Sequence, residues 1–334
     1  MGTCVSGRPP AIASMMTDST AEMTYLHPAD TKGVEQAVAL LASGGIAALP
    51  TETVYGLAAD AANGEAVARV YAAKGRPGFN PLIVHVADRA MAERYARFDP
   101  LSERLADALW PGPLTLVLPL ATDAPISSLV TAGLNTIAIR IPAHPVTQAV
   151  IRGLGRGIAA PSANASGRLS PTRAAHVLDS LNGRIPLILD AGPTTAGLES
   201  SIVAIANGQP RLLRQGAIAR ESLEAILGSP LAVAADAEPI AAPGMLLSHY
   251  APRLPIRLNA DTAGPHEFHI GFGPIPGRET LSASGDLTQA AARLFDLLHR
   301  ADASTATAIA VAPIPATGLG AAINDRLKRA AARG

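Results

Sequence analysis

The sequence of 334 residues contains one cysteine, Cys4, so an intrachain disulfide and a zinc site made of several cysteines are both excluded. Its 27 basic and 27 acidic side chains give a formal net charge of zero, which argues against a protein whose main partner is a nucleic-acid backbone. No apolar run approaches the roughly 20 residues that cross a bilayer. We therefore expect a cytoplasmic protein with no membrane segment.

Several motifs of covalent, metal-dependent or phosphate-loop chemistry are also missing. There is no G-x-x-x-x-G-K-[ST] phosphate-binding loop and no G-x-S-x-G nucleophile turn. The eight histidines show no H-E-x-x-H or other metal-ligating spacing, so we expect no protein-bound metal. The glycine clusters at 153–157 and 271–273 match a dinucleotide fingerprint poorly, and we interpret both as turns.

The composition and length favour a folded protein of two domains. Hydrophobic residues make up 48% of the chain and charged residues 16%, which suffices for sizeable cores. Apolar runs of strand length alternate with helical patterns, which predicts an α/β fold with a small parallel sheet in the second part. We expect a disordered or mis-assigned extension at 1–26, a first domain at 27–228, a linker rich in alanine and proline at 229–250, and a second domain at 251–334.

The stretch 44–86 combines an apolar run, a hydroxyl-rich turn, a helical pattern and a second apolar run. Gly75 is a helix stop and Pro77 prevents continuation, so Lys74 and Arg76 are expected in extended backbone with their side chains pointing the same way. Lysine occurs only three times in the chain. Two cations beside a threonine-rich turn suit a ligand with phosphate and small polar groups, although such cations are also common as solvated charges after a helix.

A second polar segment, 161–167 (PSANASG), lies between an expected strand at 157–160 and an expected helix at 172–181. A loop of this kind before a helix presents backbone N–H groups and hydroxyls to an anion, although most such loops are ordinary connectors. The Asn207-Gly208 pair between two apolar runs predicts a β-hairpin.

Together these segments resemble the YrdC-like threonylcarbamoyl-AMP synthases in their longer, two-domain form, from about residue 28 to the C-terminus. Gln215 stands where that family often has proline, and Ser201 where threonine is usual. The residues that carry the resemblance are 50–56 (PTETVYG), 74–77 (KGRP), 80–85 (NPLIVH), 110–115 (WPGPLT), 136–142 (TIAIRIP), 160–164 (APSAN), 170–172 (SPT), 199–203 (ESSIV), 213–216 (LRQG), 242–245 (APGM), 248–253 (SHYAPR) and 322–327 (AINDRL).

The resemblance implies a fold and an activity. The fold would be a YrdC-like twisted mixed sheet with flanking helices, followed by a smaller, Rossmann-like C-terminal α/β domain. The activity would be that of a nucleotidyltransferase: L-threonine, bicarbonate and ATP, accompanied by Mg²⁺, would give threonylcarbamoyl-AMP and pyrophosphate. The product would supply a tRNA threonylcarbamoyl-transferase complex that modifies the adenosine beside the anticodon, with weak or no direct binding of tRNA by this chain.

The resemblance also implies roles for individual residues. Lys74 and Arg76 would be catalytic, because they would hold phosphates and the developing charge. Arg140 would clamp the threonine carboxylate, since its planar fork matches that group. The ATP site would comprise Arg76, Asn80, Thr136, Ser162, Asn164, Ser170, Arg214 and Tyr250, and the threonine site Thr53, His85, Arg140, Ala160 and Ser200. A linker rich in alanine and proline has no need of the polar and aromatic cluster 248–250, so we expect the segment 230–250 to be a lid that excludes water from the adenylate, with Tyr250 reaching the nucleotide.

Two other interpretations remain at this point. A carbamoyl-transfer domain of the hydrogenase-maturation kind would share the fold, but it normally sits in a much larger chain with zinc fingers, which one cysteine excludes here. A non-enzymatic RNA-binding module would need a concave basic surface, which the neutral net charge disfavours. For Tyr250 itself, the alternative to reaching the nucleotide is that it caps the first strand of the second domain.

Overall fold

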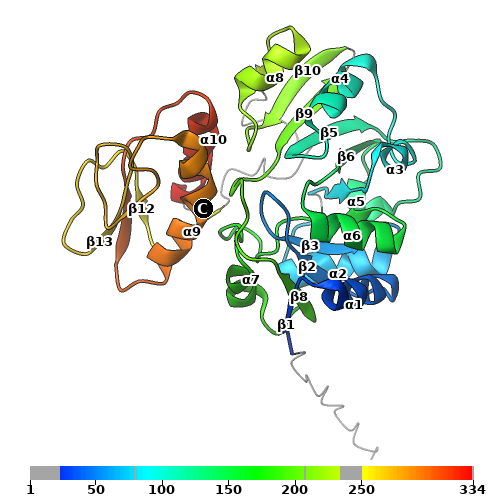
Figure 1. Cartoon of the computed structure of the whole chain (residues 1–334), viewed down its shortest axis with the longest axis horizontal. Helices are drawn as coiled ribbons and strands as arrows, with labels where there is room; N and C mark the ends of the chain where they lie inside the picture. Colours follow the sequence, from blue (N-terminus) through cyan, green and yellow to red (C-terminus); the bar gives the residue numbers. More distant parts are fainter. Residues whose placement is uncertain (1–22, 79, 207, 234–249, 333–334) are drawn as a thin grey trace, which may run out of the picture.

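The computed structural model describes residues 23–78, 80–206, 208–233 and 250–332, and in it the chain forms two α/β domains (Figure 1). Among these residues, the larger domain contains an 11-stranded sheet of mixed parallel and antiparallel pairs, and the smaller one a 4-stranded sheet whose pairs are all parallel. The predicted fold class, with a small parallel sheet in the second part, is therefore confirmed.

The larger sheet mixes the two kinds of pairing along its whole width. Parallel pairs such as β4–β6 and β5–β9 alternate with antiparallel pairs such as β5–β6 and β9–β10. In spatial order its strands are β1 (Tyr25–Pro28), β8 (Leu187–Asp190), β2 (Ala47–Leu49), β3 (Gly56–Asp60), β7 (Ile158–Ala159), β4 (Ile83–His85), β6 (Thr136–Arg140), β5 (Leu114–Pro119), β9 (Ser201–Ala206), β10 (Gln209–Arg214) and β11 (Ala232–Val233).

The sequence patterns do not indicate three of these strands, β1, β3 and β11. Strand β3 is buried along its whole length, and its Gly-Leu-Ala-Ala-Asp sequence lacks the β-branched and aromatic residues typical of strands. Strand β1 begins at Tyr25, so the sheet starts two residues inside the expected extension. The predicted hairpin is confirmed by the antiparallel β9–β10 pair, while Asn207 lies outside the described residues.

Helix ends in this domain follow the capping chemistry of the sequence. The Asn63 side chain accepts from the backbone N–H groups of Glu65 and Ala66, and Gly75 ends the same helix in the left-handed region at φ 60°. The helices of the larger domain are α1 (Thr31–Ala42), α2 (Gly64–Lys74), α3 (Arg89–Glu93), α4 (Pro100–Leu109), α5 (Ser128–Thr131), α6 (Pro145–Leu154), α7 (Ala174–Leu181) and α8 (Arg220–Leu227).

Both faces of the larger sheet are packed, because successive strand residues point to opposite sides. Leu187 and Leu189 of β8 join the core beneath α1 and α6, whereas Ile188 joins the opposite core beneath α2, α4, α7 and α8. Further along the α1 and α6 face, Ile83 packs with residues of β5, β6 and β9 in a small cluster formed by strands alone. Ile83 also lines the pocket that forms the candidate active site described below, so this pocket lies on the part of the face beyond α1 and α6.

The smaller domain packs two helices on its sheet, and Figure 1 shows these helices on the side that faces the larger domain. Phe268 and Ile270 of the sheet share a core with Leu294 and Ile323 of the helices. The elements are β12 (Ile256–Arg257), β15 (Ala308–Val311), β13 (Glu267–Gly271) and β14 (Glu279–Thr280) in spatial order, with α9 (Leu287–Asp302) and α10 (Leu319–Ala331).

The two domains are in direct contact through α9 and α10. A Cβ at Gly197 would lie 2.5 Å from backbone atoms of Ala291 and Ala292 in α9. The rings of His176 and His299 stack across the interface with centroids 3.8 Å apart. The predicted lid at 230–250 lies outside the described residues except for 230–233 and Tyr250.

Candidate active site

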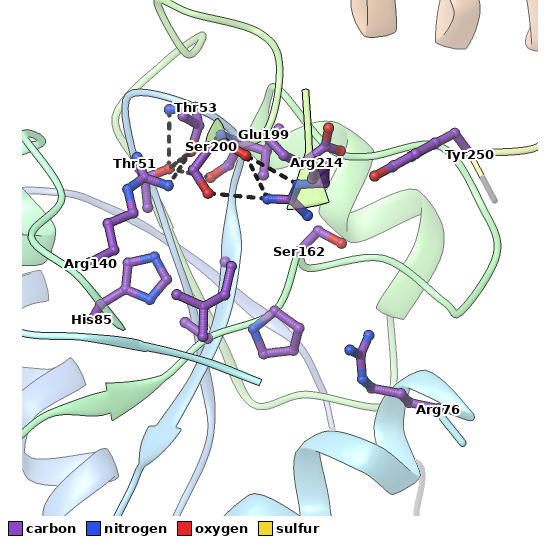
Figure 2. A pocket seen from close by; sticks show the side chains of 15 residues that line it. Thr51, Thr53, Arg76, His85, Arg140, Ser162, Glu199, Ser200, Arg214 and Tyr250 are labelled. Atoms are coloured by element: carbon purple, nitrogen blue, oxygen red, sulfur yellow. Dashed lines mark hydrogen bonds between the residues drawn. The ribbon is translucent and has the colours of Figure 1, made fainter. Parts of the chain in front are cut away.

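The main pocket of the larger domain gathers side chains from segments far apart in the sequence (Figure 2). It brings together nine of the predicted site residues and adds Glu199, which was in a family motif but had no assigned role. The lining consists of Thr51, Thr53, Val54, Gly56, Arg76, Ile83, His85, Arg140, Ala160, Pro161, Ser162, Glu199, Ser200, Arg214 and Tyr250.

Arg140 occupies one side of the pocket, at the carboxyl end of β6, and is only 3% exposed. Its Nη1 donates to Thr53 Oγ1 at 2.9 Å, and its Nε donates to the carbonyl of Gly112 at 3.1 Å. Its Nη2 lies 2.6 Å from Glu52 Oε1. These contacts fix the plane of the guanidinium, as a bidentate carboxylate clamp requires.

The hydroxyl-rich turn that follows β2 places Thr53 against this arginine. Thr51 Oγ1 donates to the carbonyl of Val54 at 2.6 Å, and the Thr51 and Thr53 hydroxyls are 2.8 Å apart. Such side-chain to backbone bonds close a turn that the chain would otherwise leave open. The turn therefore presents a buried hydroxyl next to Arg140.

His85 stands beside Arg140, because β4 and β6 are parallel and pair these two residues directly. Burial, together with the nearby Arg140 guanidinium, lowers the pKa of His85 to about 3. The imidazole is therefore neutral at pH 7. It can offer one donor or one acceptor to a ligand without adding charge.

Ser200 and Arg214 form the wall between the ends of β9 and β10 (Figure 2). Arg214 Nε donates to the carbonyl of Ser200 at 3.1 Å, and its Nη2 donates to the Ser200 hydroxyl at 3.1 Å. That hydroxyl is also 2.7 Å from the hydroxyl of Thr115. Burial lowers the pKa of Arg214.

Arg76 and Tyr250 lie on the side of the pocket away from Arg140 and His85 (Figure 2). Arg76 donates from Nε to the carbonyl of Asn80 at 3.2 Å and from Nη2 to that of Pro81 at 2.9 Å. Burial lowers the pKa of Arg76 to about 10, so it remains a cation at pH 7.

Asn80 and Thr136 do not line the pocket. The carbonyl of Asn80 accepts from Arg76 Nε, whereas Thr136 begins β6 at a position beyond the paired part of β4, because the backbone N–H of Leu82 donates to Val130 instead of to β6. Asn80 is 1% exposed, and its Oδ1 has no hydrogen-bond partner among the described residues. Asn80 thus lies on the Arg76 side of the pocket, and the carboxyl ends of β4 and β6 carry His85 and Arg140.

Lys74 is placed differently from the prediction. It is the last residue of α2, so the expectation of extended backbone with a side chain parallel to Arg76 is wrong, because the helix continues up to the Gly75 cap. Its Nζ donates to the carbonyls of Ser162 and Asn164, and it does not line the pocket. Burial and the adjacent Arg76 lower its pKa well below the usual value. Lys74 thus braces the 161–164 loop from beneath.

Ser162 lines the pocket, whereas Asn164 and Ser170 are buried behind it. Asn164 Nδ2 donates to the carbonyl of Arg168 at 2.9 Å and so holds the loop together. Ser170 Oγ donates to Glu199 Oε1 at 2.5 Å. These two predicted nucleotide-binding residues therefore support the wall of the pocket from behind.

Tyr250 joins the pocket to the second domain. It is 1% exposed, it lines the pocket, and its ring lies 5.6 Å from that of Phe295 in α9. The two roles considered for this residue, reaching the pocket and capping the second domain, are therefore compatible. Its backbone φ of +63° is in the left-handed region.

Two kinds of feature do not occur in the described parts of the chain. No group of three or more histidine, cysteine, aspartate or glutamate side chains there could hold a metal ion. Within the same residues no helix is both long and apolar enough to cross a membrane.

Three arginines, several buried hydroxyls and a neutral histidine surround this pocket. Guanidinium groups bind carboxylates and phosphates, and fixed donors of this kind can stabilise charge during group transfer. The fold and the site thus define an α/β protein with a pocket for anionic ligands.

Comparison with known proteins then identifies the family. Residues 39–216 match the Sua5/YciO/YrdC family model, described as telomere recombination, and residues 218–332 match the model described as the threonylcarbamoyl-AMP synthase C-terminal domain. The chain belongs to this family in its two-domain form, as the motifs predicted.

Full-length relatives match almost the whole chain. The threonylcarbamoyl-AMP synthase of Bacillus subtilis is 42% identical, over 89% of this chain and 92% of its own length. That of Pyrococcus abyssi is 37% identical, over 88% of this chain and 92% of its own length. The crystal structure of P. abyssi Sua5 complexed with L-threonine superposes with a TM-score of 0.85 and 34% identity, covering 92% of this chain and 98% of that one.

Proposed function

We propose that this chain synthesises threonylcarbamoyl-AMP from L-threonine, bicarbonate and ATP, and releases pyrophosphate. The observation that carries the proposal is the division of the pocket into two sides. Arg140, Thr53 and His85 stand on one side, and Arg76 and Tyr250 on the other, with Ser162 between them. A small amino acid and a nucleotide would meet in the middle.

The threonine side suits a zwitterion with a hydroxyl. Arg140 supplies a fixed guanidinium for the carboxylate, while Thr53, Ser200 and the neutral His85 supply polar groups without further charge. Ala160 also lines the pocket, and its carbonyl would be a further polar partner for threonine. The relative complexed with L-threonine supports a threonine site in this fold.

The nucleotide side supplies cations for phosphates. We assign Arg76 and Arg214 to the phosphates of ATP. Tyr250 would offer a surface for the nucleotide, and the polar partners would be Asn80, Thr136 and Ser162. Asn164 and Ser170 would act by holding the loop and the wall in place. Lys74 would either brace the 161–164 loop or turn from its carbonyls to a phosphate when ATP arrives.

In the proposed reaction the threonine amine takes up carbon dioxide from bicarbonate, and a carbamate oxygen attacks the α-phosphate of ATP. The bond to the β-phosphate breaks and pyrophosphate leaves with the electron pair. The residues of this chain would position the reactants and stabilise charge. Because the described residues offer no cluster of metal ligands, Mg²⁺ would enter on the phosphates of ATP.

We further propose that the product passes to a tRNA threonylcarbamoyl-transferase complex in the cytoplasm. The neutral net charge favours weak or no direct binding of tRNA by this chain. Transfer would then occur through the protein that receives the adenylate.

The deciding experiment is pyrophosphate release from ATP by the full chain. Release should require both L-threonine and bicarbonate, and mass spectrometry should detect threonylcarbamoyl-AMP. Equal release without threonine would overturn the proposal. Release that needs a small carbamoyl donor in place of threonine and bicarbonate would favour carbamoyl-adenylate chemistry.

A further inference from the structure

Arg326 of α10 is the largest fully buried side chain among the described residues. It belongs to the second domain, yet its guanidinium reaches the wall of the pocket in the first. Nε donates to Glu199 Oε2 at 2.8 Å, and Nη2 donates to the carbonyl of Gln215 at 2.8 Å. Nη1 donates to Asp325 Oδ2 at 2.6 Å.

Two of the three partners of Arg326, Glu199 and Gln215, are the chain neighbours of the pair that forms the pocket wall. Glu199 precedes Ser200, and Gln215 follows Arg214, whose side chain donates to Ser200. Arg326 therefore fastens the start of β9 and the end of β10 at one point. It does not line the pocket itself, so it would act through these neighbours.

Glu199 is an unexpected charge in a pocket for anions. Glu199 is 5% exposed and lines the pocket, and its carboxylate accepts from the Ser170 hydroxyl at 2.5 Å. Burial alone would raise the pKa of Glu199, but the guanidinium groups of Arg326 and Arg214 lower it below its usual value. The carboxylate is thus ionised and faces two cations.

Without Arg326, this carboxylate would have Arg214 as its remaining close cation. Arg214 would then be shared between Glu199 and any phosphate in the pocket, and the carboxylate would repel a triphosphate. An uncompensated buried charge of this kind raises the free energy of the folded protein strongly, whereas removal of both charges of a pair changes that free energy far less.

We propose that Arg326 is a positioning residue for the nucleotide: it neutralises Glu199, leaves Arg214 available to phosphates, and so makes the second domain a necessary part of the ATP site. This inference rests on the proposed function only for the identity of the nucleotide. It gives the second domain a role in the first domain's chemistry through one side chain.

The test compares Arg326→Gln with Glu199→Gln/Arg326→Gln in the full chain. The single variant should raise the KM for ATP about tenfold or more, because it leaves the carboxylate unpaired, and should change the KM for threonine by less than about threefold. The double variant should recover ATP affinity to within about threefold of the wild type. A purely structural role for Arg326 would not predict recovery on removal of a second group.

Arg329→Gln is the matched control, because Arg329 lies on the same helix and pairs with the same Asp325 at 2.9 Å. It should behave as the wild type. A pH series adds a second signature, since Glu199 faces Arg214, Tyr250 and Ser170 and would have a raised pKa in Arg326→Gln. The ATP affinity of that variant should improve as the pH falls and the carboxylate is protonated, while the wild type should change little.

Calorimetric ATP binding, without threonine, keeps this test separate from the proposed reaction. A wild type that binds ATP but lacks threonine-dependent pyrophosphate release would overturn the proposed function and still allow the comparison. Equal ATP affinity in Arg326→Gln and Arg329→Gln, or no recovery in the double variant, would overturn the inference. If Arg326→Gln does not fold, a double variant that folds but loses more than tenfold in ATP affinity overturns it as well.

Discussion

Arg140 and Glu52 form an ion pair of 2.6 Å at the edge of the pocket, so the guanidinium proposed to hold the threonine carboxylate already carries a carboxylate of the protein. A guanidinium has five N–H donors, and the hydrogen bonds to Thr53 and Gly112 use two of them, whereas Nη2 pairs with Glu52 by charge without a hydrogen bond among the described residues. The donors that remain, including those of Nη2, can serve a ligand. Glu52 and its neighbours thus orient the fork before threonine arrives.

Arg140→Lys should therefore raise the KM for threonine about tenfold or more and leave the KM for ATP nearly unchanged. Lysine keeps the charge but cannot hold three fixed partners and a carboxylate at once. Steady-state kinetics with each substrate varied in turn will measure both constants. Arg156→Lys is the control, because Arg156 is an exposed arginine that also pairs with a carboxylate, Asp60, and does not line the pocket. A selective rise in the KM for ATP would show that Arg140 faces the nucleotide instead.

Arg76→Ala and Lys74→Ala should differ, although both residues were assigned to catalysis. Arg76 lines the pocket, so its loss should cost about 2–4 kcal/mol in the barrier. Its carbonyl partners, Asn80 and Pro81, belong to its own loop, so its loss should affect stability less than loss of Lys74, whose partners are 88 and 90 residues away. Lys74 holds two loop carbonyls, so its loss should lower activity and also lower the melting temperature.

Activity and thermal unfolding measured on the same preparations will separate these two effects. An unchanged melting temperature in Lys74→Ala, with activity lost, would show that the lysine works on phosphates and not as a brace. Near-normal rates in Arg76→Ala would show that the Arg76 guanidinium does not stabilise the transition state.

Local sequence chemistry accounts for much of the fold and for the composition of the pocket. Gly75 ends α2 because glycine tolerates the left-handed region, and Arg140 ends β6 where an apolar run meets a proline. The polar loop at 161–167 indicates Ser162 as a pocket residue. Such signals lie within a few consecutive residues, so the sequence alone is enough to recognise them.

Long-range partners carry no such signal. Glu199 and Arg326 are 127 residues apart, and neither neighbourhood shows that a buried carboxylate needs a cation from another domain. Helix α2 extends as far as Lys74, one residue further than an extended Lys74 would require. This difference points the Lys74 side chain to the 161–164 loop instead of into the pocket. Tyr250 could be assigned two roles from the sequence, and only tertiary packing shows that it can serve both.

The stacked pair His176 and His299 should make stability depend on pH. Burial, with His299 as the next cause, lowers the pKa of His176 to about 3, and burial lowers that of His299 as well, in spite of the nearby Asp296. Both rings are neutral in the folded protein, whereas the unfolded chain protonates them near pH 6.5. The stabilisation is therefore complete above about pH 6.5 and is lost as the pH falls from there toward about 3.

Denaturant unfolding between about pH 7 and about pH 5 will measure this slope. His299→Phe keeps an aromatic ring in the stack and removes one titrating group, so its unfolding free energy should fall less steeply with acid. Equal slopes in the two proteins would show that other groups govern the acid sensitivity.

Gly197→Ala should weaken the contact between the two domains. Gly197 has a φ of +70°, and an added Cβ would lie 2.5 Å from backbone atoms of α9, which cannot move aside as a flexible side chain would. The matched control is Gly192→Ala in the same loop, where φ is +78° but no atom lies within 4 Å of the added Cβ. Both variants share a conformational cost of about 1 kcal/mol in the free energy of unfolding, and Gly197→Ala should cost about 1–3 kcal/mol more because of the overlap.

Calorimetric unfolding should show one transition in the control and a separated, earlier transition of the second domain in Gly197→Ala. Since Arg326 lies on that domain, Gly197→Ala should also weaken ATP binding, and equal ATP affinity in the two variants would show that the domain contact and the nucleotide site are independent.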